Sequence, residues 1–152
     1  MFAFRLERVL SVRRVQEEAA RLRHAEAEEK LRTAREILAG LRERLASALE
    51  DFDDLKRKDK VTAEALYLHT LHLAGLRREI DVARIRLAEA AAEAERTAGE
   101  LSTAHKAKKG LERHREREET EWRRQETQKE AKQVDEIAVS RHRAREEDTH
   151  GP

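Results

Sequence analysis

The sequence of 152 residues contains no cysteine, and its single proline is the last residue, Pro152. Without cysteine the chain has no disulfide bonds, no cysteine-ligated zinc and no thiol chemistry. Aromatic residues make up 3% of the chain, and glycine occurs five times. Because strands favour aromatic and β-branched residues, and turns favour glycine and proline, this composition argues against a compact α/β or all-β domain.

Long apolar runs are also missing, so the sequence predicts no membrane span. The opening residues, Met1 to Leu6, contain no apolar signal-peptide core, and the compartment we expect by default is the cytoplasm. Lysine plus arginine number 33 and aspartate plus glutamate 32, which leaves a net charge of +1. This balance gives no reason to expect a polyanion as the main partner.

What the chain does contain is alanine, glutamate, arginine, leucine and lysine, the composition of long helices and coiled coils. Apolar residues recur at alternating spacings of four and three from Ala27 to Leu55, and again from Leu66 to Ala104. The second run includes two polar positions, His69 and Thr97. Such spacing is typical of the a and d positions that form the seam of a coiled coil.

The short polar stretch between the two runs predicts the turn of a helical hairpin, with Thr62 as the N-cap of the second helix. We therefore expect an all-α fold: two long helices in an antiparallel coiled-coil hairpin. The expected bounds are a helix over 4–57, a turn over 58–62, a helix over 63–145 and a frayed tail over 146–152. Together they form a single rod, residues 1–152, in which the longer second helix has a C-terminal overhang.

Setting Leu55 opposite Leu66 predicts the whole register of the hairpin. Large residues then meet small ones in most of the later layers, which fills space without voids. The paired layers are Phe52 with His69, Ala48 with Leu73, Leu45 with Leu76, Leu41 with Ile80, Leu38 with Ala83, Ala34 with Leu87, Leu31 with Ala90, and Ala27 with Ala94.

Towards the N-terminus the apolar seam weakens, since the same register places Glu17 opposite Ala104. A stripe in a shifted register replaces it, which a stutter near residues 22–27 would reconcile with the main seam. That stripe consists of Val12, Val15, Ala19 and Leu22.

The overhang of the second helix has no partner within the expected hairpin. It nevertheless carries apolar residues, and a helix this polar is marginal alone, so we expect them to bind another protein. They are Trp122, Ala131, Val134, Ile137, Ala138 and Val139.

Catalytic and ligand-binding signals are weak throughout. His69 and His72 share a helical face but lack further ligands, so no metal site is expected. The glycines are isolated and form no phosphate-binding loop, so no cofactor is expected. Carboxylates are plentiful, but a two-helix hairpin offers no water-excluding pocket in which to tune their pKa values. We expect no enzyme activity.

Basic residues gather in two stretches, residues 5–23 and 105–117, which the hairpin would place side by side at its open end. An acidic protein surface is the partner that this charge favours. A solvated charged face is the simpler alternative. Nucleic acid is a third, weakened by the near absence of base-stacking aromatics.

Two terminal stretches resemble a known family. Residues 2–10, Phe-Ala-Phe-Arg-Leu-Glu-Arg-Val-Leu, followed by Arg13, resemble the opening F-x-F-R-L-E-x-V-L-x-x-R of the flagellar export protein FliJ family. Residues 130–138, Glu-Ala-Lys-Gln-Val-Asp-Glu-Ile-Ala, resemble the family's ending E-x-K-x-x-D-E-I-A. The chain length, the turn position and the longer second helix match as well.

The resemblance implies a component of the type III export apparatus at the flagellar base, similar to the two-helix γ stalk of rotary ATPases. Its open end would enter the hexameric export ATPase ring and promote ring assembly. The rod would contact the cytoplasmic domain of the export gate, and the protein would escort export chaperones. It would be cytoplasmic, with only an indirect, peripheral association with the inner face of the cell membrane.

The resemblance assigns family roles to individual residues by their positions in the matching motifs. The implied ATPase-binding set is Phe4, Arg5, Leu6, Val9, Leu10, Arg13, Gln133, Asp135, Glu136 and Ile137. The implied gate-binding set is His72, Leu76, Glu79 and Ala83, of which His72 departs from the aromatic residue common in the family. For Leu6, Val9 and Leu10, and for the seam residues Leu76 and Ala83, packing within the hairpin is the competing interpretation.

Three other functions stay open at this point. The first is the equivalent stalk of a virulence injectisome, although the two terminal motifs favour the flagellar system. The second is a plain coiled-coil scaffold, whose function would survive charge changes at Arg5, Arg8 and Arg13. The third is a nucleic-acid-binding hairpin, which would bind in a salt-sensitive manner without any ATPase.

Overall fold

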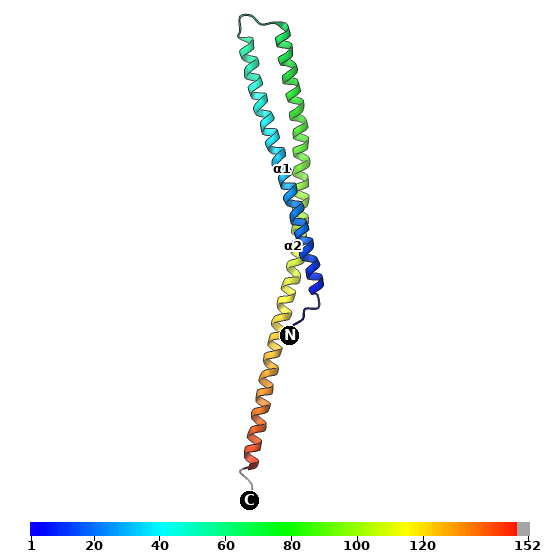
Figure 1. Ribbon diagram of the computed structural model, residues 1–152, viewed down its shortest axis with the longest axis vertical. Helices are drawn as coiled ribbons and strands as arrows, with labels where there is room; N and C mark the ends of the chain where they lie inside the picture. The colour runs from blue at the N-terminus through cyan, green and yellow to red at the C-terminus, as the bar shows by residue number, and fades with distance from the viewer. Residues whose placement is uncertain (149–152) are drawn as a thin grey trace. The chain divides into compact units, whose positions relative to one another are not determined.

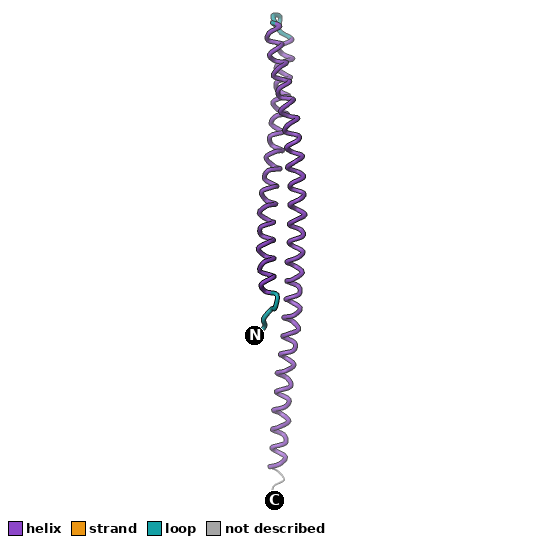
Figure 2. The backbone as a smooth tube through the Cα atoms, turned by 90° about the vertical axis from the view of Figure 1, so that its right-hand side faces the viewer, coloured by secondary structure: helices purple, strands orange, loops and turns teal. Residues whose placement is uncertain are grey.

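The computed structural model describes residues 1–148, and the side chains of residues 1–142. Two helices account for nearly all of this range: α1, Glu7–Lys56, and α2, Ala63–Asp148 (Figure 1). The described residues contain no strand. Figure 2 shows α1 beside an antiparallel stretch of α2, with loops before α1 and between the helices. The all-α hairpin with a longer second helix is therefore confirmed.

Contacts within the chain divide it into two compact units. The hairpin unit comprises residues 15–105, which include the turn. The terminal unit comprises residues 1–14 together with the chain from Lys106 onward.

The helix bounds differ from the expected ones by up to three residues. Helix α1 begins at Glu7, not at Phe4, because Phe4 instead closes a turn in which its carbonyl accepts a hydrogen bond from the Glu7 amide at 3.1 Å. Helix α2 begins at Ala63 as expected, and Thr62 caps it by accepting a hydrogen bond from the Ala65 amide at 3.2 Å. Of the expected tail, residues 146–148 belong to α2, and residues 149–152 lie outside the described residues.

The core of the hairpin unit confirms the predicted register. Three apolar clusters follow one another along the seam, and each joins residues that the register had paired. They contain Ala48, Leu73 and Leu76, with Leu45 and Phe52 packed against them; Leu38, Leu41, Ile80 and Ala83, with Leu45 and Leu87; and Ala27, Leu31 and Ala94, with Leu87 and Ala90. Nearest the turn, the rings of Phe52 and His69 lie 6.1 Å apart.

The predicted stutter near residues 22–27 is wrong. Val15 and Leu22 are 67% and 59% exposed, whereas Glu17 and Ala20 are buried in the original register. A carboxylate can occupy the seam here because its charge is compensated. The His105 Nδ1 atom donates a hydrogen bond to Glu17 Oε1 at 2.7 Å, and Arg21 lies 3.7 Å from the same oxygen.

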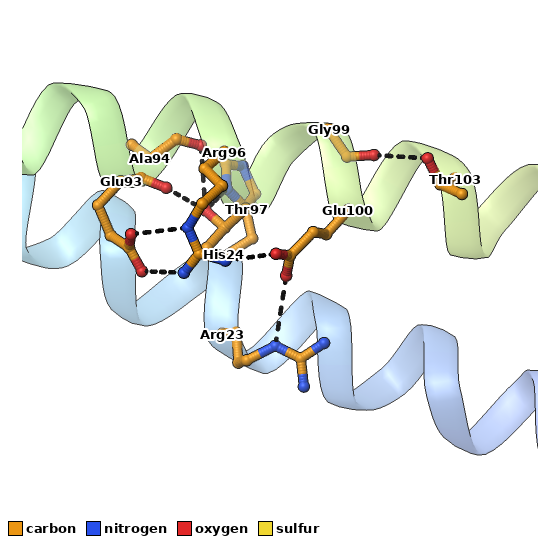
Figure 3. Close-up of polar contacts among 9 residues, drawn as sticks. All are labelled: Arg23, His24, Glu93, Ala94, Arg96, Thr97, Gly99, Glu100 and Thr103. Carbon is orange, nitrogen blue, oxygen red and sulfur yellow. Dashed lines mark hydrogen bonds and ion pairs between the residues drawn. The ribbon is translucent and has the colours of Figure 1, made fainter.

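One heptad further along the seam, a second layer is also polar (Figure 3). His24 Nδ1 lies 3.1 Å from the Thr97 hydroxyl, which in turn donates to backbone carbonyls of its own helix. Beside this layer Arg23 pairs with Glu100 across the helices at 3.7 Å. Hydrogen bonds therefore replace apolar packing over two layers of the seam, without a shift in its spacing.

Candidate functional site

Aromatic contacts anchor the N-terminal residues of the terminal unit onto α2. The Phe2 ring lies 6.1 Å from the Trp122 ring, and the Phe4 ring meets His114 edge-on at 5.8 Å. Phe4 is buried and Trp122 half-buried. The expectation that Trp122 has no partner within the chain is thus wrong, because its ring contacts Phe2.

Charged side chains hold the first turns of α1 in the same unit. One oxygen of Glu7 lies 3.4 Å from Arg115 Nε, and the other lies 3.8 Å from Arg14. Arg14 also lies 3.8 Å from Glu112. Glu7 thereby pairs with two guanidinium groups, and Arg14 pairs with two carboxylates, so the first turns of α1 are linked to α2 by ion pairs.

The N-terminal part of the expected ATPase-binding set separates by exposure. Phe4 and Leu10 are buried and Leu6 is half-buried, so these three side chains pack mainly within the chain. Arg5, Val9 and Arg13 are exposed. The hairpin-packing interpretation therefore holds for Leu10 and in part for Leu6, but not for Val9.

The C-terminal part of that set lies on a fully exposed stretch of α2. All side chains from Ala131 to His142 are exposed, among them Gln133, Asp135, Glu136 and Ile137. Val134 and Ile137 are three residues apart and share a helical face with Ala131 and Ala138. Val139, two residues beyond Ile137, points to a different side. Four apolar side chains of this stretch therefore lie on one face, which also carries Arg141.

The expected gate-binding set is divided between the core and the surface of the hairpin unit. Leu76 and Ala83 are buried in the seam. His72 and Glu79 are exposed on one flank of it, where Glu79 pairs with Arg44 of α1 at 3.9 Å. The structure thus brings together two surface residues that a partner can reach and two core residues that position them.

An open groove of about 830 Å³ runs along this flank. Its floor is apolar, with Ile37 and Val82 projecting into solvent at about half exposure. Its rim is charged, and Glu79 and Ala83 of the expected set belong to its lining. We call this surface, formed by the groove lining together with His72, the groove flank.

The two histidines that share a helical face, His69 and His72, have different surroundings. His69 packs on Phe52, whereas His72 is exposed on the groove flank. The described residues contain no group of three or more histidine, aspartate and glutamate side chains placed to bind an ion.

Comparison with known proteins identifies the family. A family model for the flagellar FliJ protein matches residues 1–147. The chain belongs to the FliJ family. A putative YscO homolog from Chlamydia trachomatis has a similar fold, with a TM-score of 0.72 and 20% identity over 97% of this chain and 99% of that chain. At this identity the likeness concerns the fold alone. The search of curated proteins found no match.

FliJ-family membership and the coiled-coil fold together support a component of type III protein export. The described helices include none with the length and apolarity that a membrane span needs. The family motifs identified the terminal residues, but they did not separate buried from exposed members. The groove flank was missed, although Ile37 and Val82, apolar residues beside the seam, were a signal in the sequence.

Proposed function

We propose that this FliJ-family protein is a non-enzymatic stalk of the flagellar type III export apparatus. In this role its terminal unit binds the hexameric export ATPase and promotes assembly of the ATPase ring. Its hairpin unit contacts the cytoplasmic domain of the export gate. It also escorts export chaperones, and it works in the cytoplasm at the inner face of the membrane, with no nucleic-acid partner.

The observation that carries the proposal is the exposure of residues 131–142 within a family-matched helix. An isolated helix gains nothing from an apolar face that stays in water, so Val134 and Ile137 are best explained by a protein partner. Asp135 lies beside that face and adds charge, which favours one orientation of the partner over others. At the other end of the chain, Arg5 and Val9 offer further exposed contacts.

ATP hydrolysis by the purified cognate export ATPase tests this contact. The chain offers a matched pair of positions, because Ile137 and Val139 are 52% and 51% exposed and lie on different sides of α2. We expect the wild-type protein to stimulate hydrolysis, the Ile137→Ser variant to lose most of that stimulation, and the Val139→Ser variant to retain it. Equal activity of both variants with wild type would argue against the assigned face.

The gate contact is proposed for the groove flank, where Glu79 belongs to the groove lining and His72 is exposed on the same side of α2. Binding of the purified gate domain to the His72→Ala/Glu79→Ala variant measures it. Glu89→Ala, on an exposed position of the same helix, is the control. We expect the double variant to bind about tenfold more weakly, a loss of about 1.4 kcal/mol. Unchanged binding would contradict the assignment of the gate contact to this flank.

The flagellar rather than the injectisome assignment follows the family model, which describes a flagellar protein. Stimulation of an injectisome ATPase in preference to the flagellar enzyme would reverse it. The absence of any stimulation, with the hairpin folded, would favour the plain scaffold.

A further inference from the structure

The two flanks of the hairpin-unit seam differ in how their charges are paired. On the groove flank, residues that directly precede seam positions carry opposite charges on the two helices. Arg44 and Glu79 pair at 3.9 Å, and Arg23 and Glu100 pair at 3.7 Å. These are the g positions of the coiled coil, where such interhelical pairs ordinarily form.

The opposite flank places like charges together. Arg42 follows the seam residue Leu41, and Arg77 follows the seam residue Leu76. Both arginines therefore occupy e positions of the coiled coil. They lie at the same level along the seam as the pair of Arg44 and Glu79 on the groove flank. Two guanidinium groups stand where a pair of opposite charges would stabilise the hairpin.

One heptad along the seam the arrangement repeats. Arg35 follows Ala34, and Arg84 follows Ala83. Both arginines therefore lie between the seam layer that contains Leu38 and the next layer, which contains Leu87. At 1.5 Å per residue, the two like-charged layers are about 10.5 Å apart along each helix. We call the four residues Arg35, Arg42, Arg77 and Arg84 the arginine flank.

Most of the arginine flank is unpaired within the part of the chain that the structure describes. Arg35, Arg42 and Arg77 make no hydrogen bond or ion pair there, and all are exposed. Arg84 alone has a partner, Asp81 of its own helix at 3.3 Å. Neither Arg35 nor Arg42 has an acidic residue three or four positions away, so their helix provides no neutralising neighbour.

Small residues adjoin these arginines. Ala39 and Ala46 on α1 and Ala88 on α2 are exposed, and Ala74 is half-buried. Their methyl groups are short, so the longer guanidinium side chains extend beyond them. A third helix can therefore approach closely and still reach the arginines.

We propose that the arginine flank binds an acidic amphipathic helix of another protein, whose carboxylates are spaced one heptad apart. That spacing matches the two layers, and each guanidinium can hold a carboxylate through two parallel hydrogen bonds. Single-stranded nucleic acid fits less well, because the sequence has no aromatic residue between residues 5 and 51 or between 68 and 121. An anionic membrane would also meet Glu36 and Glu43, which directly follow two of the arginines.

The arginine flank lies on the other side of the seam from the groove flank and uses none of the residues assigned to the ATPase or the gate. The inference is therefore independent of the proposed function. Its test is chosen so that neither the export ATPase nor the gate domain takes part.

Fluorescence anisotropy with a labelled synthetic helix tests the proposal. The probe is an alanine- and glutamine-based peptide with pairs of glutamates repeated every seven residues, and the reference peptide has the same composition with its glutamates spread around the helix. We expect the full-length wild-type chain to bind the probe at least about tenfold more tightly than the reference peptide. Equal binding of the two peptides would overturn the proposal.

Variants locate the contact. Arg35→Gln/Arg42→Gln/Arg77→Gln should bind the probe about tenfold more weakly, whereas the matched variant of the groove flank should change by less than about twofold. That matched variant is Arg44→Gln/Arg78→Gln/Arg86→Gln. Equal losses in both, or tighter binding of phosphatidylglycerol vesicles or single-stranded DNA than of the probe, would overturn the assignment.

A charge-reversal variant separates loss of probe binding from loss of folding. Arg35→Glu/Arg42→Glu places carboxylates opposite Arg84 and Arg77, so its thermal midpoint should equal or exceed that of the wild type while probe binding is lost. A lower midpoint would show that the arginines do not face one another and would refute the geometry on which the proposal stands.

Discussion

Replacing Leu76 with alanine tests whether this residue acts through the core or through a partner. Leu76 is 2% exposed and packs with Ala48 and Leu73, although the FliJ resemblance assigned it to the gate contact. Leucine to alanine removes about 2.4 kcal/mol of transfer free energy at about 0.8 kcal/mol per methylene group. The space left behind adds to this, so we expect a destabilisation of about 3 kcal/mol.

Circular dichroism at the helical band, followed through urea and thermal unfolding, measures the effect. For a chain of this size, about 3 kcal/mol corresponds to a fall in the thermal midpoint of roughly 6–12 °C. Leu71→Ala is the matched control, since Leu71 lies on the same helix and is 51% exposed; its cost should stay below about 1 kcal/mol. A Leu76→Ala variant as stable as Leu71→Ala would refute the placement of Leu76 in the seam.

Three further predictions follow from individual contacts. Arg42→Glu should stabilise the hairpin by about 0.5 kcal/mol, seen as a slightly higher thermal midpoint, because it replaces a like-charge neighbour by an opposite one. Phe2→Ala should shift the fluorescence of Trp122, the single tryptophan, to longer wavelength, since the ring lying 6.1 Å away is lost; an unchanged spectrum would contradict that contact. The hydrogen bond from Arg96 lowers the pKa of Glu93, so its stabilisation is present above the ordinary glutamate pKa and is lost as the pH falls through the lowered value. The thermal midpoint of Glu93→Gln should therefore fall less than that of the wild type as the solution is acidified. An equal fall in both proteins would contradict the stabilising contact between Glu93 and Arg96.

The register of the hairpin was predictable because each layer depends on local spacing alone. From Ala27 to Leu55 the side chains that face the partner helix are apolar, and in most of the later layers a large residue faces a small one. With the turn placed before Thr62, only one alignment of the two runs pairs them throughout. The observed clusters follow that alignment.

The polar part of the seam was not predictable from the same rule. Glu17 is buried because of His105, a residue 88 positions away in the sequence, and apolar spacing carries no information about such a pair. Val15 and Leu22 formed the better apolar stripe, but choosing it would have shifted the register against the clusters that follow. Keeping one register along the whole coiled coil is more favourable than burying these few aliphatic side chains.

The candidate site was predictable only in outline. The terminal motifs identified a set of positions, but the burial of Phe4 depends on the edge-on contact with His114, which no spacing rule includes. The arginine flank could be recognised only after the register of the hairpin was known. A single arginine in a helix carries no signal until its neighbours across the seam are identified.

Site-specific crosslinking to the export ATPase tests the central claim most directly. The chain has no cysteine, so a single introduced cysteine carries a photoreactive maleimide at one position only. We expect the Ile137→Cys protein to crosslink to the assembled ATPase and the Val139→Cys protein to crosslink far less. Equal yields at both positions, or no crosslink at Ile137 with the ring assembled, would contradict the proposed ATPase contact.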